Sequence, residues 1–224
     1  MSPSRAVAGA TVILATLLST AAAQALTLSD GDWTDWTARD IGPATGPQTI
    51  TVQTSGGNPG NWLEVETTTT AATNKAHFDP ALVYDPSGGA ILALDFGIDT
   101  IILQANNPDG MAFALLAEQG GSLFYAPPAV TGSSATGWVS YADTGLMDGH
   151  FELYEGSGTL DFGTSGAPIA FGLRTGNNLV TGTRVGYDNF SVTLDIAPIP
   201  VPATLPLVLA GVGALALASR RRTS

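Results

Sequence analysis

The stretch 187–196, YDNFSVTLDI, shows the most regular pattern in this chain. Apolar and polar side chains alternate from residue 190 onward. The apolar set is Phe190, Val192, Leu194 and Ile196, and the polar set is Ser191, Thr193 and Asp195. Because successive side chains of a β-strand point to opposite faces, this pattern predicts a strand with one face in a core. Segment 169–174 repeats it, with Ile169, Phe171 and Leu173 opposite Ala170, Gly172 and Arg174.

Further short segments of the same kind precede these two. They are rich in β-branched and aromatic residues and are separated by Gly, Pro, Asn and Asp. They are 49–54, 62–67, 90–95, 100–104, 137–141, 150–154 and 158–162. Segment 111–118, MAFALLAE, fits a short helix or a strand. The spacing predicts an all-β fold in which two antiparallel sheets pack as a jelly-roll sandwich.

Residues 26–198 are enough for one domain with a sizeable core, and no linker or repeat divides them. These residues include all 19 acidic residues of the chain and four basic ones, so their formal charge is −15. The basic residues are Arg39, Lys75, Arg174 and Arg184. Such a charge repels nucleic acid, and we expect no nucleic-acid partner. The chain has no cysteine, which excludes thiol catalysis, disulfides and Cys-ligated metal centres.

Residues 1–25 have the form of a secretory signal peptide. Arg5 precedes an apolar run at 6–18, and Ala23 and Ala25 supply the small residues of a signal-peptidase site. We therefore predict export through the secretion translocon and cleavage after Ala25 by signal peptidase. The alternative is a permanent amino-terminal anchor, which the shortness of the apolar run disfavours.

The last residues, 199–224, read IPVPATLPLVLAGVGALALASRRRTS. A Pro-rich motif, an apolar segment at about 203–219 and an arginine cluster follow one another. The motif is Ile199, Pro200, Val201, Pro202 and Ala203, and the cluster is Arg220, Arg221 and Arg222. The apolar segment is near the lower length limit for a helix that spans a bilayer, and the arginines favour a cytoplasmic end. This predicts a transmembrane helix with the domain outside, and the alternative is a buried core helix.

This order of motif, apolar segment and arginines resembles the VPLPA variant of the PEP-CTERM sorting signals of exported Gram-negative proteins. The chain departs from that pattern at Ile199, where Val is usual, and at Val201, where Leu is usual. The resemblance implies processing near 200–203 by an exosortase-like membrane enzyme. It implies a precursor anchored in the membrane by the C-terminal helix, and then a place in the cell envelope, at the outer surface or in the extracellular matrix.

Three segments of the domain resemble the jelly-roll modules common among PEP-CTERM proteins, which are related in form to laminin-type and carbohydrate-binding sandwiches. They are 57–63, 168–172 and 186–192. The resemblance implies a jelly-roll domain and makes extracellular polysaccharide the ligand to expect.

Catalytic motifs are lacking. The chain has no GxSxG, HExxH, phosphate-loop or dinucleotide fingerprint, and His77 and His150 lack a companion motif. Because glycoside hydrolysis needs two carboxylates, the pairs Asp95/Asp99, Glu64/Glu66 and Glu152/Glu155 leave a secreted hydrolase open as the alternative function.

A structural calcium ion is the one cofactor that the sequence suggests. Asp30 and Asp32 begin the mature domain and Asp188 lies in its closing strand, so the three carboxylates could converge where these strands meet. They could equally be ordinary turn and surface acids.

Tryptophans supply the candidate ligand-binding residues. Trp33, Trp36, Trp62 and Trp138 could offer flat apolar faces to sugar rings, or they could lie in the core. Trp33 and Trp36 stand among aspartates, a setting that predicts partial exposure. The sequence thus predicts an exported, exosortase-sorted envelope or matrix protein that is not an enzyme. Its sandwich would bind polysaccharide or serve a structural role.

Overall fold

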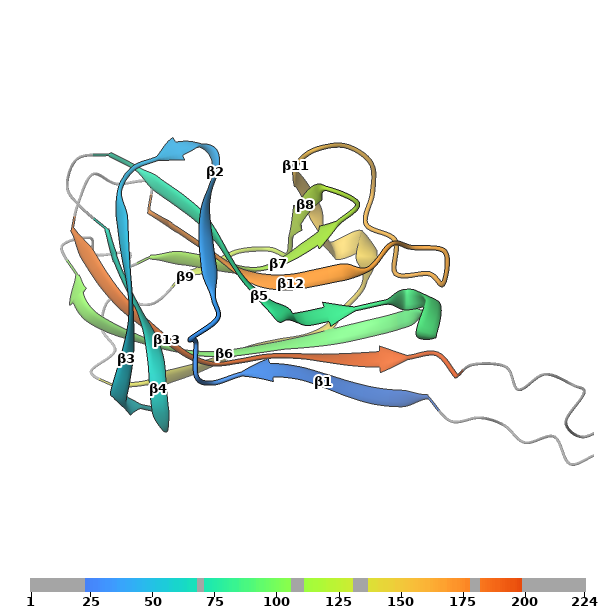
Figure 1. Cartoon of the computed structure of the whole chain (residues 1–224), viewed down its shortest axis with the longest axis horizontal. Helices are drawn as coiled ribbons and strands as arrows, with labels where there is room; N and C mark the ends of the chain where they lie inside the picture. Colours follow the sequence, from blue (N-terminus) through green and yellow to red (C-terminus); the bar gives the residue numbers. More distant parts are fainter. Residues whose placement is uncertain (1–22, 68–70, 106–110, 131–136, 178–181, 199–224) are drawn as a thin grey trace, which may run out of the picture. The chain divides into compact units, whose positions relative to one another are not determined.

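The computed structural model describes residues 23–67, 71–105, 111–130, 137–177 and 182–198. In these ranges the strands form two antiparallel sheets that pack face to face (Figure 1). The predicted all-β sandwich is therefore confirmed. No helix within these ranges is long and apolar enough to cross a membrane. The sorting segment 199–224 and residues 1–22 of the signal peptide lie outside the described residues.

The first sheet has the strand order β10-β6-β13-β4-β3, and β1 pairs with the second half of β13. Its strands are β1 (Gln24–Asp30), β3 (Gln48–Gly57), β4 (Gly60–Thr67), β6 (Ile91–Ala105), β10 (Val139–Leu146) and β13 (Thr183–Ile196). β13 is hydrogen-bonded to β6 along one side and to β4 and β1 along the other. The stretch with the most regular alternation is thus the centre of this sheet.

The second sheet has the order β11-β8-β7-β12-β5-β2, with β9 beside β7. Its strands are β2 (Thr37–Thr45), β5 (Thr73–Tyr84), β7 (Ala112–Gln119), β8 (Ser122–Tyr125), β9 (Ala129–Val130), β11 (Glu152–Glu155) and β12 (Ile169–Asn177). β7 settles the ambiguity at 111–118 in favour of a strand. Two short 3-10 turns, η1 (Pro86–Gly88) and η2 (Asp148–His150), connect strands.

The core lies between the sheets. Phe190, Val192 and Leu194 of β13 are fully buried, and Phe171 and Leu173 of β12 belong to the same apolar cluster. The alternation read from the sequence therefore points to the correct side on both central strands. Removing this apolar surface from water is the main contribution to the stability of such a fold.

The prediction of a strand at 158–162 is wrong. Leu160 and Phe162 are buried, which explains the strand-like pattern, but the backbone of this segment joins no sheet. Instead, the Asp161 N–H donates to the Gln119 side chain over 2.8 Å, and the Phe162 carbonyl accepts from the Ile91 N–H over 2.9 Å. Conversely, β5 forms at 73–84, where the sequence reading expected no strand.

The two ends of the described domain lie together. Gln24 at the start of β1 pairs with Ile196 at the end of β13 (Figure 1). Ala25, the residue before the predicted cleavage point, pairs with Asp195. A mature chain that begins at Leu26 would keep the pairs from Leu26 to Asp30. Segments attached to the two ends would leave the sandwich at the same place.

Candidate functional site

Two of the four candidate tryptophans meet on the outer face of the first sheet. Leu63 and Val65 of β4 point into the core. Because side chains alternate along a strand, Trp62, which precedes Leu63, points outward. Its ring lies edge-on to that of Trp138, with centroids 5.7 Å apart and an interplanar angle of 80°. We call these two residues the tryptophan pair.

The Trp62 ring packs closely over Gly186 of β13, where a side chain would not fit. A Cβ at Gly186 would stand 2.8 Å from the Trp62 ring and 2.6 Å from Ile101. Each indole also has a fixed hydrogen bond, since Trp62 Nε1 donates to the Ser55 carbonyl over 2.9 Å and Trp138 Nε1 to the Gly56 carbonyl over 3.2 Å. Trp62 is 8% exposed and Trp138 is half-buried, so Trp138 presents the accessible ring and Trp62 supports it.

Polar side chains adjoin the tryptophan pair on the same face. Gln53 of β3 is directly opposite Trp62 and donates to Glu64 over 2.9 Å. Arg184 of β13 donates its Nε to the other oxygen of Glu64 over 2.8 Å. This bond and the charge of Glu64 raise the pKa of Arg184. This face therefore places an aromatic ring beside the polar side chains of Gln53, Glu64 and Arg184, in which the charges of Glu64 and Arg184 cancel.

Trp33 and Trp36 lie elsewhere, beside Phe190, and the expected partial exposure of Trp33 is wrong. Trp33 is 1% exposed and packs in the core. Its aspartate neighbour permits this, because the Asp30 carboxylate accepts the backbone N–H groups of Asp32 and Trp33 and the indole N–H of Trp36. Trp33 takes a positive φ of 61° in the resulting turn. Neither the turn nor the burial leaves its ring open to a ligand, and Trp36 is half-buried against the same core.

The predicted calcium ligands are not gathered into one site. Asp30 accepts the Asp32 N–H and Asp32 accepts the Thr34 N–H, so both carboxylates are bonded within their own loop. The hydrogen bonds from Thr34 lower the pKa of Asp32. Asp188 is fully buried and accepts the N–H of Asn189 over 2.7 Å, beside Asp99 across the β13–β6 ladder. Within the part of the chain that the structure describes, no three His, Asp or Glu side chains are arranged to hold a metal ion.

The outer face of the second sheet carries a different cluster. Arg174 of β12 lies against the rings of Tyr125 and Tyr154, with its guanidinium carbon 5.2 and 5.0 Å from their centroids. Its Nε donates to Asn74 Oδ1 over 2.9 Å, and Asn74 donates to the Tyr154 hydroxyl. We call these four residues the arginine clamp. The Tyr125 hydroxyl donates to Glu152, and this bond raises the pKa of Tyr125.

The second sheet curls so strongly that its two edge strands meet beside the clamp. Arg39 of β2 bonds Glu155 of β11 over 3.2 Å and Glu118 of β7 over 3.4 Å. The Gly42 N–H donates to Glu155 over 2.6 Å, and Ile41 is buried in a small apolar cluster on this face. Sequence reasoning missed Arg174, which stands in the outward-facing half of the 169–174 alternation.

The two histidines are structural. His77 is fully buried, its Nε2 is 2.8 Å from the Thr175 hydroxyl, and burial, with a smaller contribution from Lys75, lowers its pKa to about 3. The exposed His150 accepts the Met147 N–H at the start of η2 over 3.0 Å.

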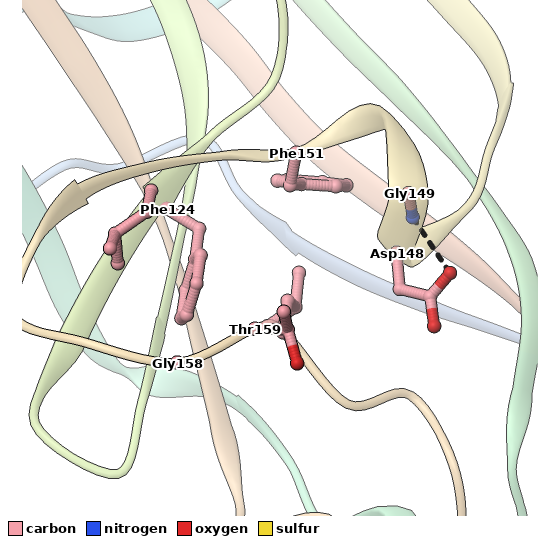
Figure 2. Close-up of a pocket in the computed structure, with 8 residues that line it drawn as sticks. Phe124, Asp148, Gly149, Phe151, Gly158 and Thr159 are labelled. Atoms are coloured by element: carbon pink, nitrogen blue, oxygen red, sulfur yellow. Dashed lines mark hydrogen bonds between the residues drawn. The ribbon is translucent and has the colours of Figure 1, made fainter.

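Two hollows lie apart from the tryptophan pair and the arginine clamp. One, of about 430 Å³, is lined by Phe124 and Phe151 on one side and by Asp148 on the other, and Asp148 accepts the Gly149 N–H over 2.7 Å (Figure 2). It holds a single carboxylate. The other, of about 270 Å³ on β1, β6 and β13, is lined by two, Asp95 and Asp195. Asp95 accepts the Gly145 N–H over 2.8 Å.

No family model matches the chain, and no curated protein matches it. Among solved structures it is similar to a family 11 carbohydrate-binding module from Clostridium thermocellum, in complex with a β-1,3-1,4-mixed-linked tetrasaccharide. The identity is 16%, the TM-score is 0.47, and 81% of this chain and 100% of the module are covered. A xylan-binding domain of family 22 has 12% identity and a TM-score of 0.42, over 78% and 96% of the two chains. An exo-β-agarase has 14% identity and a TM-score of 0.47, over 77% of this chain and 25% of the agarase. These similarities are too distant to give this chain a ligand.

Proposed function

We propose that this chain is an exported, exosortase-sorted protein of the envelope or extracellular matrix whose sandwich binds polysaccharide without catalysis. The observation that carries the binding is the tryptophan pair with its adjoining polar row. Sugar rings have apolar C–H faces that pack on aromatic rings and hydroxyl groups that need hydrogen-bond partners. Trp138 supplies the first, and Gln53, Glu64 and Arg184 supply the second at one place.

The pair is also rigid, which favours binding. Both indole N–H groups are already bonded to carbonyls at the end of β3, and Gly186 leaves room for the Trp62 ring against the sheet. A ligand therefore need not order these side chains, and that entropy cost is avoided on association.

Export rests on the two terminal segments of the sequence, and the fold is compatible with it. Since β1 begins where β13 ends, a leader and a sorting segment would be joined to one end of the sandwich.

Binding is tested with the full chain, purified in a mild detergent, by electrophoresis through gels that contain single polysaccharides, the host's own exopolymer included. We expect retardation by at least one neutral polymer. Trp138→Ala should weaken it roughly tenfold, since burial of an aromatic face contributes about 1–3 kcal/mol. Val139→Ala, the adjacent residue with a 49% exposed side chain, is the matched control and should leave it unchanged. Equal retardation of both variants would assign binding to another surface.

Sorting is tested by the intact mass and the cell fraction of the native protein. Cleavage after Ala25 and near 200–203, in an outer-surface or matrix fraction, is expected. A species in the inner membrane that retains 205–224 would contradict the exosortase step.

The alternative, a secreted hydrolase, gains one observation, the hollow with Asp95 and Asp195. It predicts that reducing ends are released from a bound polysaccharide and that Asp95→Asn abolishes the release. The binding proposal predicts no release from any polymer that retards the chain.

A further inference from the structure

Arg174 is exceptional among the basic residues of the domain. The domain has four basic residues against 19 acidic ones, so an arginine without an acidic partner is unexpected. Lys75 pairs with Asp40, Arg39 with Glu118 and Glu155, and Arg184 with Glu64. In the described ranges, no carboxylate lies within ion-pair distance of Arg174.

The arginine clamp fixes the position of this guanidinium. Tyr125 and Tyr154 stand nearly perpendicular, at 88° with centroids 5.7 Å apart, and both contact Arg174. Asn74, which is 6% exposed, accepts the Nε–H and is itself held by its bond to Tyr154. An arginine fixed in this way loses little further freedom when it binds a ligand.

The arginine clamp bonds the guanidinium of Arg174 through Nε alone, and its terminal N–H groups have no hydrogen-bond partner among the described residues. Of the five N–H groups, only that of Nε has a hydrogen-bond partner among the described residues, and the side chain is half-buried. The neighbouring acids have other partners, since Glu155 is bonded to Arg39 and Gly42, Glu118 to Arg39 and Glu152 to Tyr125.

We propose that Arg174 is a second sugar site, which binds the carboxylate of an acidic sugar such as a uronic-acid residue. A planar guanidinium matches a carboxylate in two parallel hydrogen bonds, and the tyrosine edges offer apolar contact to the sugar ring beside it. The site lies on the opposite face of the sandwich from the tryptophan pair. It rests on the proposed polysaccharide-binding function and names the chemical class that this function includes.

The charge of the domain makes this proposal specific. A formal charge of −15 repels an anionic polymer, so general electrostatics predicts a preference for neutral polymers. At physiological salt that repulsion is screened beyond about 8 Å, whereas a bidentate pair acts at contact. A preference for an acidic polymer therefore requires a local cation with a free edge.

The test compares two polymers that differ only in the carboxylate, polygalacturonate and its fully methyl-esterified form, with the full chain in mild detergent at 0.15 M salt. We expect the native chain to bind polygalacturonate roughly tenfold more tightly, from hydrogen bonds to a charged group. Arg174→Gln should abolish that preference, and Arg174→Lys should keep only part of it. Lys75→Gln removes the same charge from an internally paired residue and should preserve it.

The native comparison needs no variant, so a failure of Arg174→Gln to fold leaves the test intact. Equal binding of both polymers by the native chain would overturn the arginine site and leave the tryptophan site standing. A preference that Lys75→Gln loses as fully as Arg174→Gln would also overturn it. Binding to no acidic or neutral polymer would overturn both proposals.

Discussion

The two outer faces of the sandwich use the same kinds of residue in opposite ways. On the first sheet the arginine is neutralised, because Arg184 is bonded to Glu64, and the aromatic ring of Trp138 is left accessible. On the second sheet the tyrosine rings contact Arg174, whose charge has no acidic partner among the residues that the structure describes. One face therefore offers an apolar surface and the other offers a cation. Residue composition alone does not distinguish them; the internal pairing does.

The largest expected difference between the sheets is their response to acid. His77 of β5 belongs to the second sheet, while the strands of the first sheet contain no histidine. The folded-state pKa of His77 is about 3, against 6.5 for the free side chain, because burial disfavours the charged ring. Below pH 6.5 the unfolded chain takes up a proton that the folded chain refuses, so stability is present above pH 6.5 and is lost as the pH falls toward 3.

This loss should reach roughly 4 kcal/mol across that window, at about 1.4 kcal/mol for each pH unit. Urea denaturation between pH 7 and pH 3.5 measures it, with His77→Gln as the variant that keeps a polar partner for Thr175 but does not titrate. The difference in stability between the native chain and the variant should shrink with acid. In acid, the backbone amide hydrogens of β5 and β12 should then exchange with solvent faster than those of β6 and β13. A difference independent of pH would contradict the assignment.

The next effect concerns two glycines, Gly172 in β12 of the second sheet and Gly186 in β13 of the first. A Cβ at Gly172 would meet the His77 carbonyl and the Phe78 ring, and a Cβ at Gly186 would meet Trp62 and Ile101. Gly172→Ala should cost more than Gly186→Ala, since a backbone carbonyl yields less than side chains, and both should cost about 1–3 kcal/mol from overpacking.

Gly149→Ala serves as the control, because nothing lies within 4 Å of its added methyl group, and should change stability by less than about 0.5 kcal/mol. Midpoints of urea unfolding at pH 7 rank the three variants. Gly186→Ala should also reduce polysaccharide retardation if Trp62 supports Trp138, whereas Gly172→Ala should not. If Gly172→Ala reduced retardation and Gly186→Ala did not, the polysaccharide would bind the second sheet and not the tryptophan pair.

The sandwich itself could be predicted because its central strands are locally consistent. In β13 and β12 the branched and aromatic residues alternate with polar or small ones, and the fold buries the expected set. The segment 158–162 misled because Leu160 and Phe162 are buried like strand residues, while its backbone bonds go to Gln119 and Ile91. Periodicity reports which side chains are buried and does not report where the backbone hydrogen bonds go.

The site was harder to predict, since it depends on pairing between distant residues. Trp62 and Trp138 could be named as candidates, but their contact crosses from β4 to the start of β10. Trp33 was expected to be exposed because of its aspartate neighbours, and the structure uses Asp30 to cap the turn that buries it. The isolation of Arg174 has one signal in the sequence, an arginine that shares a strand face with Ala170 and Gly172. Whether an acid would reach it depends on the curl of the sheet.

The smallest expected effect is the energy of the main polar contact of each arginine, Arg184 on the first sheet and Arg174 on the second. A double-mutant cycle on Glu64→Gln and Arg184→Gln should give a coupling energy of about 1 kcal/mol at low salt, since the pair is partly exposed. The same cycle on Asn74→Ala and Arg174→Gln should give a similar value, from a hydrogen bond between a cation and a neutral amide. In 1 M salt the first coupling should fall by half or more, because screening weakens ion pairs, and the second should stay constant. A second coupling that fell as steeply would mean that Arg174 is held by an acid after all, and its free edge would no longer be available to a carboxylate ligand.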